Sequence, residues 1–280
     1  MTRANGDFNG RVQAGIGRIV HLGSPHLTAA MVSVELAFRR TRLIKAYHRW
    51  FAKEPLRGDR LRFAYYYHCA STEEWTGFVR ERKYTKLLDI TPDEDQIVSA
   101  FSKTSRYEVR RARKEEMEFG MVEQMDKFLK FYNQFAAAKN LPEMDEMILS
   151  SYWPHMRVTS MGREGEVFVM HAYVVDGAAS RVNLIHSASG FRGMYDKELR
   201  RLYGRGNRLL HMEDILWFKQ EGFRCYDFGG YAFQTGDKSL AAVNEFKDSF
   251  GGELIEESNY TSIALSKLRQ TKKWLAKRRP

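Results

Sequence analysis

Hydrophobic and polar positions alternate in two different rhythms along the second half of the chain. In residues 166–175 and 179–189 the period is two, which predicts a pair of strands, and Asp176-Gly177 between them is a hairpin turn signal. In residues 208–221 the apolar side chains instead recur at helical spacing. Residues 223–228 then form an aromatic-rich stretch typical of a strand. These patterns predict a hairpin, then a helix, then a further strand.

The rest of the chain adds helices and strands in alternation. Further strands are predicted at 18–22, 61–70, 87–90 and 260–265, and further helices at 26–53, 72–82, 91–100, 105–114, 124–139 and 145–155. This alternation favours an α/β (α+β) fold with a mixed sheet flanked by helices. A break at 116–124 predicts four segments: a flexible N-terminus (1–16), a smaller N-terminal α/β domain (17–118), a C-terminal domain (119–265) and a tail (266–280).

The stretch Gly204-Arg205-Gly206-Asn207 precedes the predicted helix at 208–221. Asn207 is a plausible N-cap, and a glycine-containing loop at a helix start exposes backbone N–H groups at the positive end of the helix dipole. Arg205 and Arg208 add charge-assisted donors. The spacing predicts a phosphate or pyrophosphate site, with a tight capped turn as the alternative. Neither GxGxxG nor Gly-Lys-Ser/Thr occurs, so a dinucleotide-oxidoreductase or P-loop interpretation is not supported.

The net charge of +10 is concentrated in two places. Residues 266–280 hold seven basic residues and no acidic one, and residues 101–114 hold six basic residues against Glu108. The remaining chain is close to neutral, which excludes a generally basic, histone-like protein. The tail is either a basic amphipathic helix that touches anionic lipid or a solubilising terminus.

The basic stretch at 101–114 contains a predicted helix, with Ser105 and Glu108 as a capping box. One face of this helix carries the basic residues Arg106, Arg110, Arg113 and Lys114. The face is either a solvated basic surface or a surface for the phosphates of a nucleotide-linked substrate or of nucleic acid. Nucleic acid is the weaker interpretation, because aromatic side chains for stacking do not recur there.

Cysteine content and hydropathy indicate the cellular compartment of the protein. The two cysteines, Cys69 and Cys225, cannot form a disulfide framework, and no Cys/His spacing is typical of a zinc site. The chain has no apolar run of about 18 residues, and residues 1–15 lack the apolar core of a signal peptide. We therefore expect a cytoplasmic protein without a bound metal.

Several segments, taken in order, resemble the Fem-type branch of the GNAT acyltransferases, which comprises the peptidoglycan bridge aminoacyltransferases and their acyl-CoA-using relatives. The segments are LLDITP (87–92), SKTSRYEVRRA (102–112), HSAS (186–189), NRLLHMED (207–214), YDFGG (226–230), NEFK (244–247) and FGG (250–252). The resemblance covers roughly residues 85–265 and implies a GNAT-like mixed sheet flanked by helices, preceded by a partial GNAT-like domain. No helical hairpin arm is evident and the N-terminal part is short, which favours the acyl-CoA-using relatives.

The resemblance implies an N-acyltransferase that moves an acyl group from acyl-CoA to the amino group of a nucleotide-linked amino sugar in surface-glycan biosynthesis, by direct attack. The alternative is a transferase that takes its aminoacyl group from tRNA and acts on a peptidoglycan precursor. A third hypothesis, from another class, is a non-catalytic protein that binds RNA or anionic lipid through the basic helix near Arg110. We further expect a homodimer, no DNA, and peripheral membrane contact through the tail.

Individual residues receive roles from the resemblance and from their positions. By resemblance, Lys247 stabilises charge at the acceptor or the oxyanion. Phe246, Arg106 and Arg110 contact the substrate, and Arg205, Gly206, Asn207 and Arg208 hold the CoA pyrophosphate. Asp227, at the end of a predicted strand, can orient or deprotonate the amine, and His186 is an imidazole that can line the donor site as a base. The alternatives are that Lys247 is a surface lysine, that residues 205–208 belong to a capped turn, and that Asp227 caps a turn.

Overall fold

The computed structural model describes residues 65–69, 72–74, 77–177, 179–190 and 196–277. The chain divides into two compact units, one formed by Met1–Lys83 with Glu256–Pro280 and one formed by Tyr84–Ile255. The predicted flexible N-terminus, the strand at 18–22 and the helix at 26–53 lie outside the described residues. Each unit is described by itself.

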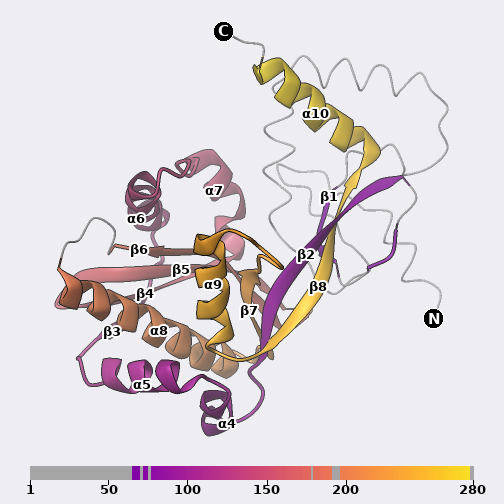
Figure 1. Cartoon of the computed structure of the whole chain (residues 1–280). Helices are drawn as coiled ribbons and strands as arrows, with labels where there is room; N and C mark the ends of the chain where they lie inside the picture. The colour runs from indigo at the N-terminus through magenta and orange to yellow at the C-terminus, as the bar shows by residue number, and fades with distance from the viewer. Residues whose placement is uncertain (1–64, 70–71, 75–76, 178, 191–195, 278–280) are drawn as a thin grey trace. The chain divides into compact units, whose positions relative to one another are not determined.

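The smaller unit contains β1 (Tyr65–Cys69), the first half of β2 (Phe78–Asp89), most of β8 (Glu253–Ser262) and helix α10 (Ile263–Lys277) (Figure 1). Strand β1 runs antiparallel to β8. Arg80 on β2 donates hydrogen bonds to Ser258 Oγ at 2.7 Å and to Glu256 Oε1 at 2.6 Å. Residues 266–277 of the basic tail are thus part of a helix that begins at Ile263, and contact of the tail with a membrane stays a prediction.

The larger unit is built on a mixed sheet in the order β8-β2-β7-β6-β5-β4-β3. Its further strands are β3 (Glu118–Met121), β4 (Met156–Arg163), β5 (Glu166–Asp176), β6 (Arg181–Ser189) and β7 (Cys225–Gly230). The pairs β3–β4, β4–β5, β5–β6 and β2–β7 are antiparallel, whereas β6 and β7 are parallel. The predicted hairpin around Asp176-Gly177 is the β5–β6 pair.

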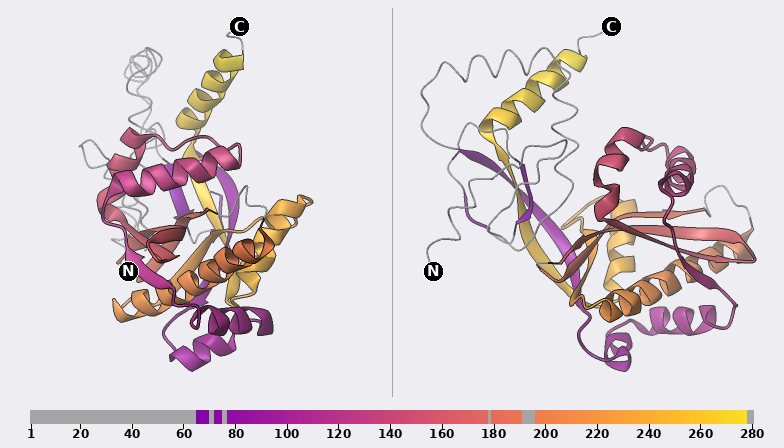
Figure 2. Two further views of the ribbon diagram at one scale, coloured as in Figure 1. Left: turned by 90° about the vertical axis from the view of Figure 1, so that its left-hand side faces the viewer. Right: turned by 180° about the vertical axis from the view of Figure 1, so that it is seen from behind.

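Helices cover both faces of this sheet, as the two views of Figure 2 show. The helices are α4 (Glu94–Ser99), α5 (Lys103–Ala112), α6 (Met125–Ala138), α7 (Glu146–Tyr152), α8 (Lys197–Gln220) and α9 (Lys238–Asp248). Helix α6 packs on β5 and β6, α8 packs on β4, β5 and β6 from the other side, and α5 lies against α8. The predicted mixed sheet flanked by helices is confirmed.

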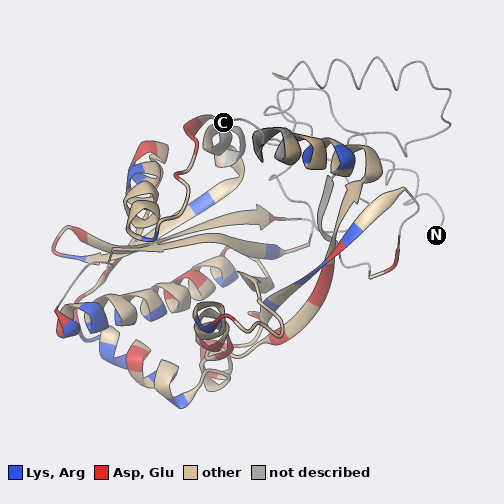
Figure 3. Ribbon diagram, turned by 45° about the horizontal axis from the view of Figure 1, so that its top comes forward, with Lys and Arg blue, Asp and Glu red and all other residues tan. Residues whose placement is uncertain are grey.

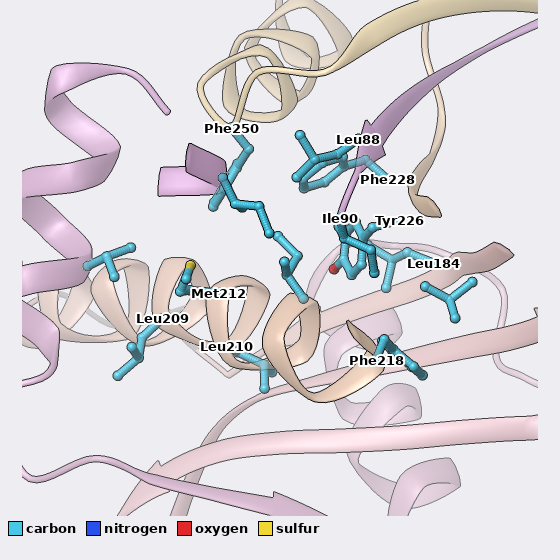
Figure 4. Packing of buried hydrophobic residues seen from close by; sticks show 14 of the residues in the cluster. Leu88, Ile90, Leu184, Leu209, Leu210, Met212, Phe218, Tyr226, Phe228 and Phe250 are labelled. Carbon is cyan, nitrogen blue, oxygen red and sulfur yellow. The ribbon is translucent and has the colours of Figure 1, made fainter. Parts of the chain in front are cut away.

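The core lies between the sheet and α8. The apolar face of α8 contributes Leu209, Leu210, Met212, Ile215 and Phe218, all buried (Figure 4). They meet Tyr226 and Phe228 of β7, Leu88 and Ile90 at the end of β2, and Phe250 after α9. Because burying one such side chain contributes about 1.5–3 kcal/mol, this helix–sheet contact is a major source of stability in the unit.

One predicted helix is wrong, and three features were not predicted. Residues 72–82, predicted as a helix, contain the start of β2. The first turns of α8, over residues 197–203, and the strands β3 and β4 were not predicted. Strand β4 escaped notice because its buried face includes the polar Thr159, so its hydropathy does not alternate cleanly.

The predicted helix caps are displaced by two or three residues. Helix α4 begins at Glu94 and not at the predicted residue 91, and Asp93 caps it in a capping box with Gln96. Helix α5 is capped by Ser102, whose Oγ accepts from the Ser105 N–H at 3.1 Å. Ser105 is instead buried in the first turn of α5.

No break divides the larger unit at 116–124. The unit begins at Tyr84 and includes α5, whose Val109 and Ala112 belong to the same buried cluster as Leu209 of α8. Residues 84–118, assigned above to an N-terminal domain, are therefore part of the same unit as α8. Residues 256–265, assigned to the C-terminal domain, belong instead to the smaller unit.

Candidate active site

The Gly204-Arg205-Gly206-Asn207 stretch lies inside α8 and is not a loop. The helix begins at Lys197, two turns earlier, so the backbone N–H groups of residues 204–207 are engaged within the helix. Asn207 is therefore not an N-cap. The expected pyrophosphate site on free N–H groups at 204–207 is wrong in its physical basis, because a helix offers such donors only in its first turn.

The actual start of α8 is already capped by a carboxylate. Asp196 accepts hydrogen bonds from the N–H groups of Glu198 at 2.8 Å and Leu199 at 3.2 Å. Glu198 adds a second acidic side chain in the first turn. The helix dipole stabilises these two negative side chains. They also occupy the helix end where a phosphate would otherwise bind.

The two glycines of the stretch face different surroundings. Gly206 is buried against the sheet, where an added Cβ would touch Phe168 at 3.4 Å and Met117 at 3.5 Å. Gly204 has no atom within 4 Å of an added Cβ. Gly206 therefore permits close packing of α8 on the sheet, whereas packing gives no reason for a glycine at 204.

Arg205 and Arg208 point to different partners. Arg205 is buried and donates to both carboxylate oxygens of Glu115, from Nε at 2.8 Å and from a terminal nitrogen at 2.6 Å. Arg208 places its guanidinium 4.9 Å from the centroid of the Phe246 ring. Its Nε is buried without a hydrogen-bond partner among the described residues, and burial lowers the pKa of Arg208.

Asp227 lies on β7 and is completely buried. Its carboxylate accepts from Asn183 Nδ2 at 2.9 Å and from the Gly229 N–H at 2.8 Å. The Arg181 guanidinium and the Thr85 hydroxyl donate to it as well. A carboxylate with four donors and no exposed surface is suited to hold β2, β6 and β7 in register, and it is poorly placed to take a proton from an external amine.

Lys247 lies in the last turn of α9, with its ammonium group at the end of β7. Its Nζ donates to the backbone carbonyls of Gly230 at 2.5 Å and Gly229 at 3.2 Å. Burial lowers the pKa of Lys247 from 10.5 to about 8, against an opposing effect of the Asp227 carboxylate. At pH 7 the amine is still mostly protonated, so this is a desolvated cation at the carboxyl end of a central strand.

The parallel pair β6–β7 ends beside this cation. The strands are paired from Arg181–Cys225 to Asn183–Asp227, and β6 then continues to Ser189. At Gly229 the chain has a φ of 75°, and a Cβ there would lie 2.5 Å from the Leu184 carbonyl oxygen. A glycine is needed at this position because both the backbone conformation and the close approach to β6 exclude a side chain.

His186 is turned toward α6. A register shift between β5 and β6 pairs Tyr173 with Leu184 and the preceding residue, Ala172, with His186. Because neighbouring residues of β5 point to opposite faces of the sheet, Leu184 and His186 do so as well. The His186 ring packs against Tyr132 at 4.9 Å, and burial lowers its pKa to about 4. An imidazole with this pKa is neutral at pH 7 and is a weak base.

Arg106 and Arg110 lie on α5 and are directed to its own backbone and to α4. Arg106 donates to the Ser99 carbonyl at 3.2 Å, and Arg110 Nε donates to the Arg106 carbonyl at 3.3 Å. Phe246 contacts Arg208 and, at 5.4 Å between ring centroids, His211. Of the predicted site residues, the structure thus brings Phe246 and Arg208 together, and it places Lys247 near enough to Asp227 for the carboxylate to act on its pKa.

A buried polar network joins α8 to strands β5 and β7, and it was not predicted from the sequence. His171 Nδ1 donates to Asp214 Oδ2 at 2.8 Å, and Tyr173 Oη donates to the same oxygen at 2.5 Å. Tyr226 Oη lies 2.6 Å from Tyr173 Oη and 2.8 Å from His211 Nδ1. These groups come from strands and a helix far apart in sequence, so no spacing pattern joins them.

Among the described helices, none is both long and apolar enough to cross a membrane. Within the described ranges, no group of three or more His, Cys, Asp or Glu side chains is arranged to hold a metal ion.

The described part of the chain has the mixed sheet flanked by helices that the sequence predicted, with β6 and β7 as a central parallel pair. Among solved structures it is similar to FemX, with a TM-score of 0.56 and 13% identity over 74% of this chain and 68% of that chain. This likeness confirms the predicted Fem-like fold. No family model and no curated protein matches the sequence.

Two further solved structures have lower TM-scores. L-PGS from Bacillus licheniformis has a TM-score of 0.45 and 12% identity over 72% of this chain and 68% of that chain. A GCN5-related N-acetyltransferase from Kribbella flavida has a TM-score of 0.35 and 11% identity over 67% and 60%. At TM-scores below 0.5 these two do not define the fold.

Proposed function

We propose that this protein is an N-acyltransferase in which the Lys247 ammonium stabilises negative charge on the acyl group during transfer. The observation that carries the proposal is the position of this cation. It is desolvated, its pKa is lowered to about 8, and it is held on the carbonyls of Gly229 and Gly230 beside the end of the parallel strands. A fixed charge in a partly dry site acts strongly on developing charge.

The proposed reaction is a direct attack. The nitrogen of a neutral acceptor amine forms a bond to the acyl carbonyl carbon, and the carbonyl oxygen becomes an oxyanion beside Lys247. The bond from this carbon to the carrier sulfur or oxygen then breaks, the carrier leaves with the bonding electrons, and the proton lost by the amine passes to the leaving group or to solvent. The buried imidazoles of His171 and His211 are hydrogen-bonded to Tyr173, Asp214, Asn207 and Tyr226, and the proposed transfer does not require these two histidines to activate a nucleophilic side chain.

Asp227 has a supporting part in this proposal. It fixes Gly229 through the backbone N–H and Arg181 through its guanidinium. It thereby positions the carbonyls that hold Lys247, and its negative charge keeps the lysine protonated to a higher pH than burial alone would allow. Asp227 is a positioning residue, and the base for the acceptor amine is not assigned to it.

Two donors are compatible with this chemistry. The first is acyl-CoA, with the amino group of a nucleotide-linked amino sugar as acceptor. The second is aminoacyl-tRNA, with a peptidoglycan precursor as acceptor. The fold likeness to FemX and the carboxylate cap at the start of α8, which opposes a pyrophosphate there, both favour the second candidate.

The test compares both donors with three proteins: wild type, Lys247→Met, and Lys238→Met as a matched control on the same helix. Thiol release is measured with acetyl-CoA and UDP-linked amino sugars, and label transfer is measured with charged tRNA and a UDP-linked muramyl peptide. We expect transfer with one donor, a loss of about 100-fold or more in kcat/KM for Lys247→Met, and no change for Lys238→Met. Transfer at the wild-type rate by Lys247→Met, or no transfer from either donor, would overturn the proposal.

A further inference from the structure

Helices α5 and α8 enclose a basic groove that the proposed reaction does not yet use. The groove has a volume of about 380 Å³ and is lined by Glu108 and Arg111 of α5 and by Arg201, Gly204, Arg205 and Arg208 of α8. Figure 3 shows Lys and Arg on the two neighbouring helices. We refer to these six residues as the α5–α8 groove.

The arginines of the groove are partly neutralised by carboxylates. Glu115 holds Arg205 and lies 3.5 Å from Arg111 Nε, and Glu198 pairs with Arg201. Glu108 lines the groove, and its charge opposes the lowering of the pKa of Arg208 by burial. Four guanidinium groups thus face three carboxylates, which leaves the groove net positive.

Arg208 has an unmet hydrogen-bonding requirement. Its Nε is buried without a partner among the described residues. A buried N–H of this kind destabilises the folded chain unless a ligand or a water satisfies it. The guanidinium is held in place by the Phe246 ring at 4.9 Å, so its orientation is fixed before a ligand arrives.

Gly204 forms the open part of the groove. It lies in the interior of a 24-residue helix, where glycine is less favourable than alanine. Packing does not explain it, because no atom lies within 4 Å of an added Cβ. A glycine without a packing role leaves room for a ligand to approach the helix backbone between the arginines.

We propose that the α5–α8 groove binds phosphate groups of the acyl donor through Arg111, Arg201 and Arg208. Guanidinium groups suit phosphate because they form two parallel hydrogen bonds to its oxygens. The proposal rests on the proposed function insofar as it names the donor. Arg208 joins the groove to the surroundings of Lys247, because it contacts Phe246 and because its charge and that of Lys247 both act on the buried His211 imidazole. The donor's phosphates would thereby be anchored beside the cation that receives the acyl group.

Binding is measured directly with CoA, with inorganic pyrophosphate and with a short RNA hairpin ending in an acceptor stem. The groove variant is Arg111→Ala with Arg201→Ala, two exposed arginines whose loss leaves the core intact. The matched control is Arg106→Ala with Arg110→Ala, which removes the same charge from α5 outside the groove. A third variant, Gly204→Glu, places a carboxylate in the groove at a helical position that tolerates a side chain.

We expect at least one probe to bind, about tenfold or more weaker binding in the groove variant and in Gly204→Glu, and a change below about threefold in the control. Binding of CoA identifies a small-molecule donor, and binding of the RNA alone identifies a tRNA donor; either result supports the groove. Equal weakening in the groove variant and the control would show diffuse attraction and overturn the proposal, as would the absence of binding to all three probes.

Lys247→Met separates the groove from the reaction. If this variant binds the probe as the wild type does but transfers nothing, both proposals stand. If the wild type binds phosphate in the groove but transfers no acyl group, the groove stands and the proposed function fails. If the wild type transfers an acyl group while the groove variant matches it in binding and KM, the function stands and the groove fails.

Discussion

Replacing Lys247 by methionine should make the protein more stable at neutral pH while it abolishes transfer. Burial lowers the pKa of Lys247 from 10.5 to about 8. One pKa unit corresponds to about 1.4 kcal/mol, so the charged side chain is disfavoured in the folded state by roughly 3 kcal/mol relative to the unfolded chain. Methionine keeps the aliphatic stem without the charge. After subtracting about 1 kcal/mol for the lost hydrogen bonds to Gly229 and Gly230, a net gain of about 2 kcal/mol is expected.

The stability difference between wild type and Lys247→Met should depend on pH in one direction. The unfolded chain keeps the lysine proton up to about pH 10.5, whereas the folded protein releases it near pH 8. Between these values the unfolded state binds more protons, so the stability of the wild type rises with pH. The advantage of Lys247→Met should therefore shrink by about 2 kcal/mol between roughly pH 7 and pH 9.5.

Urea unfolding followed by tryptophan fluorescence at the two pH values measures this difference. Lys238→Met, which removes an exposed lysine from the first turn of α9, is the control and should change little at either pH. A stability difference between wild type and Lys247→Met that is the same at both pH values would refute the claim that Lys247 is desolvated in the folded protein.

Three further changes test the surroundings of the site. The pKa of His186 is lowered to about 4, so the unfolded chain binds its proton below pH 6.5 while the folded protein does not. Acid unfolding curves should show about 2 kcal/mol of stability lost between roughly pH 8 and pH 5 in the wild type that is absent in His186→Gln. Asp227→Asn removes the carboxylate to which Arg181 donates, and chemical denaturation should show a loss of about 3–5 kcal/mol. Gly229→Ala forces a Cβ to 2.5 Å from the Leu184 carbonyl at positive φ and should lower stability by about 2–4 kcal/mol. An unchanged midpoint in any of the three would contradict the contact concerned.

The sequence predicted the elements whose local signals agree with their packing. The β5–β6 hairpin has a turn signal between two strands of period two. The roles given to Phe246 and Lys247 come from a family motif and stay predictions. The start of α8 was missed because two glycines suggested a loop, although Leu199, Leu202, Tyr203 and Gly206 already have helical spacing. That spacing was the available signal, and it identifies the apolar face on which Tyr203 and Gly206 are buried.

The polar contacts of the site could not be predicted in the same way. His171 meets Asp214 across 43 positions, and Asp227 meets Thr85 across 142. Such pairs depend on strand order and on the packing of α8, neither of which a single sequence specifies through periodicity. The bulge that turns His186 toward α6 is of the same kind, because one extra residue in a strand leaves no mark in the hydropathy pattern.

The structure changes the way in which the Gly204–Asn207 stretch could bind a phosphate. As a loop, this stretch would bind an anion through backbone N–H groups and the helix dipole, and the glycines would serve the turn. As part of a helix, it offers no free N–H groups, and Gly206 serves packing on the sheet. Under the groove proposal the anion is bound by side chains, and arginines line the helix face that Gly204 leaves open. Binding by guanidinium groups on two helices, instead of by one helix end, makes the position of α5 part of the site, because Arg111 reaches the groove only while Val109 and Ala112 are packed against α8.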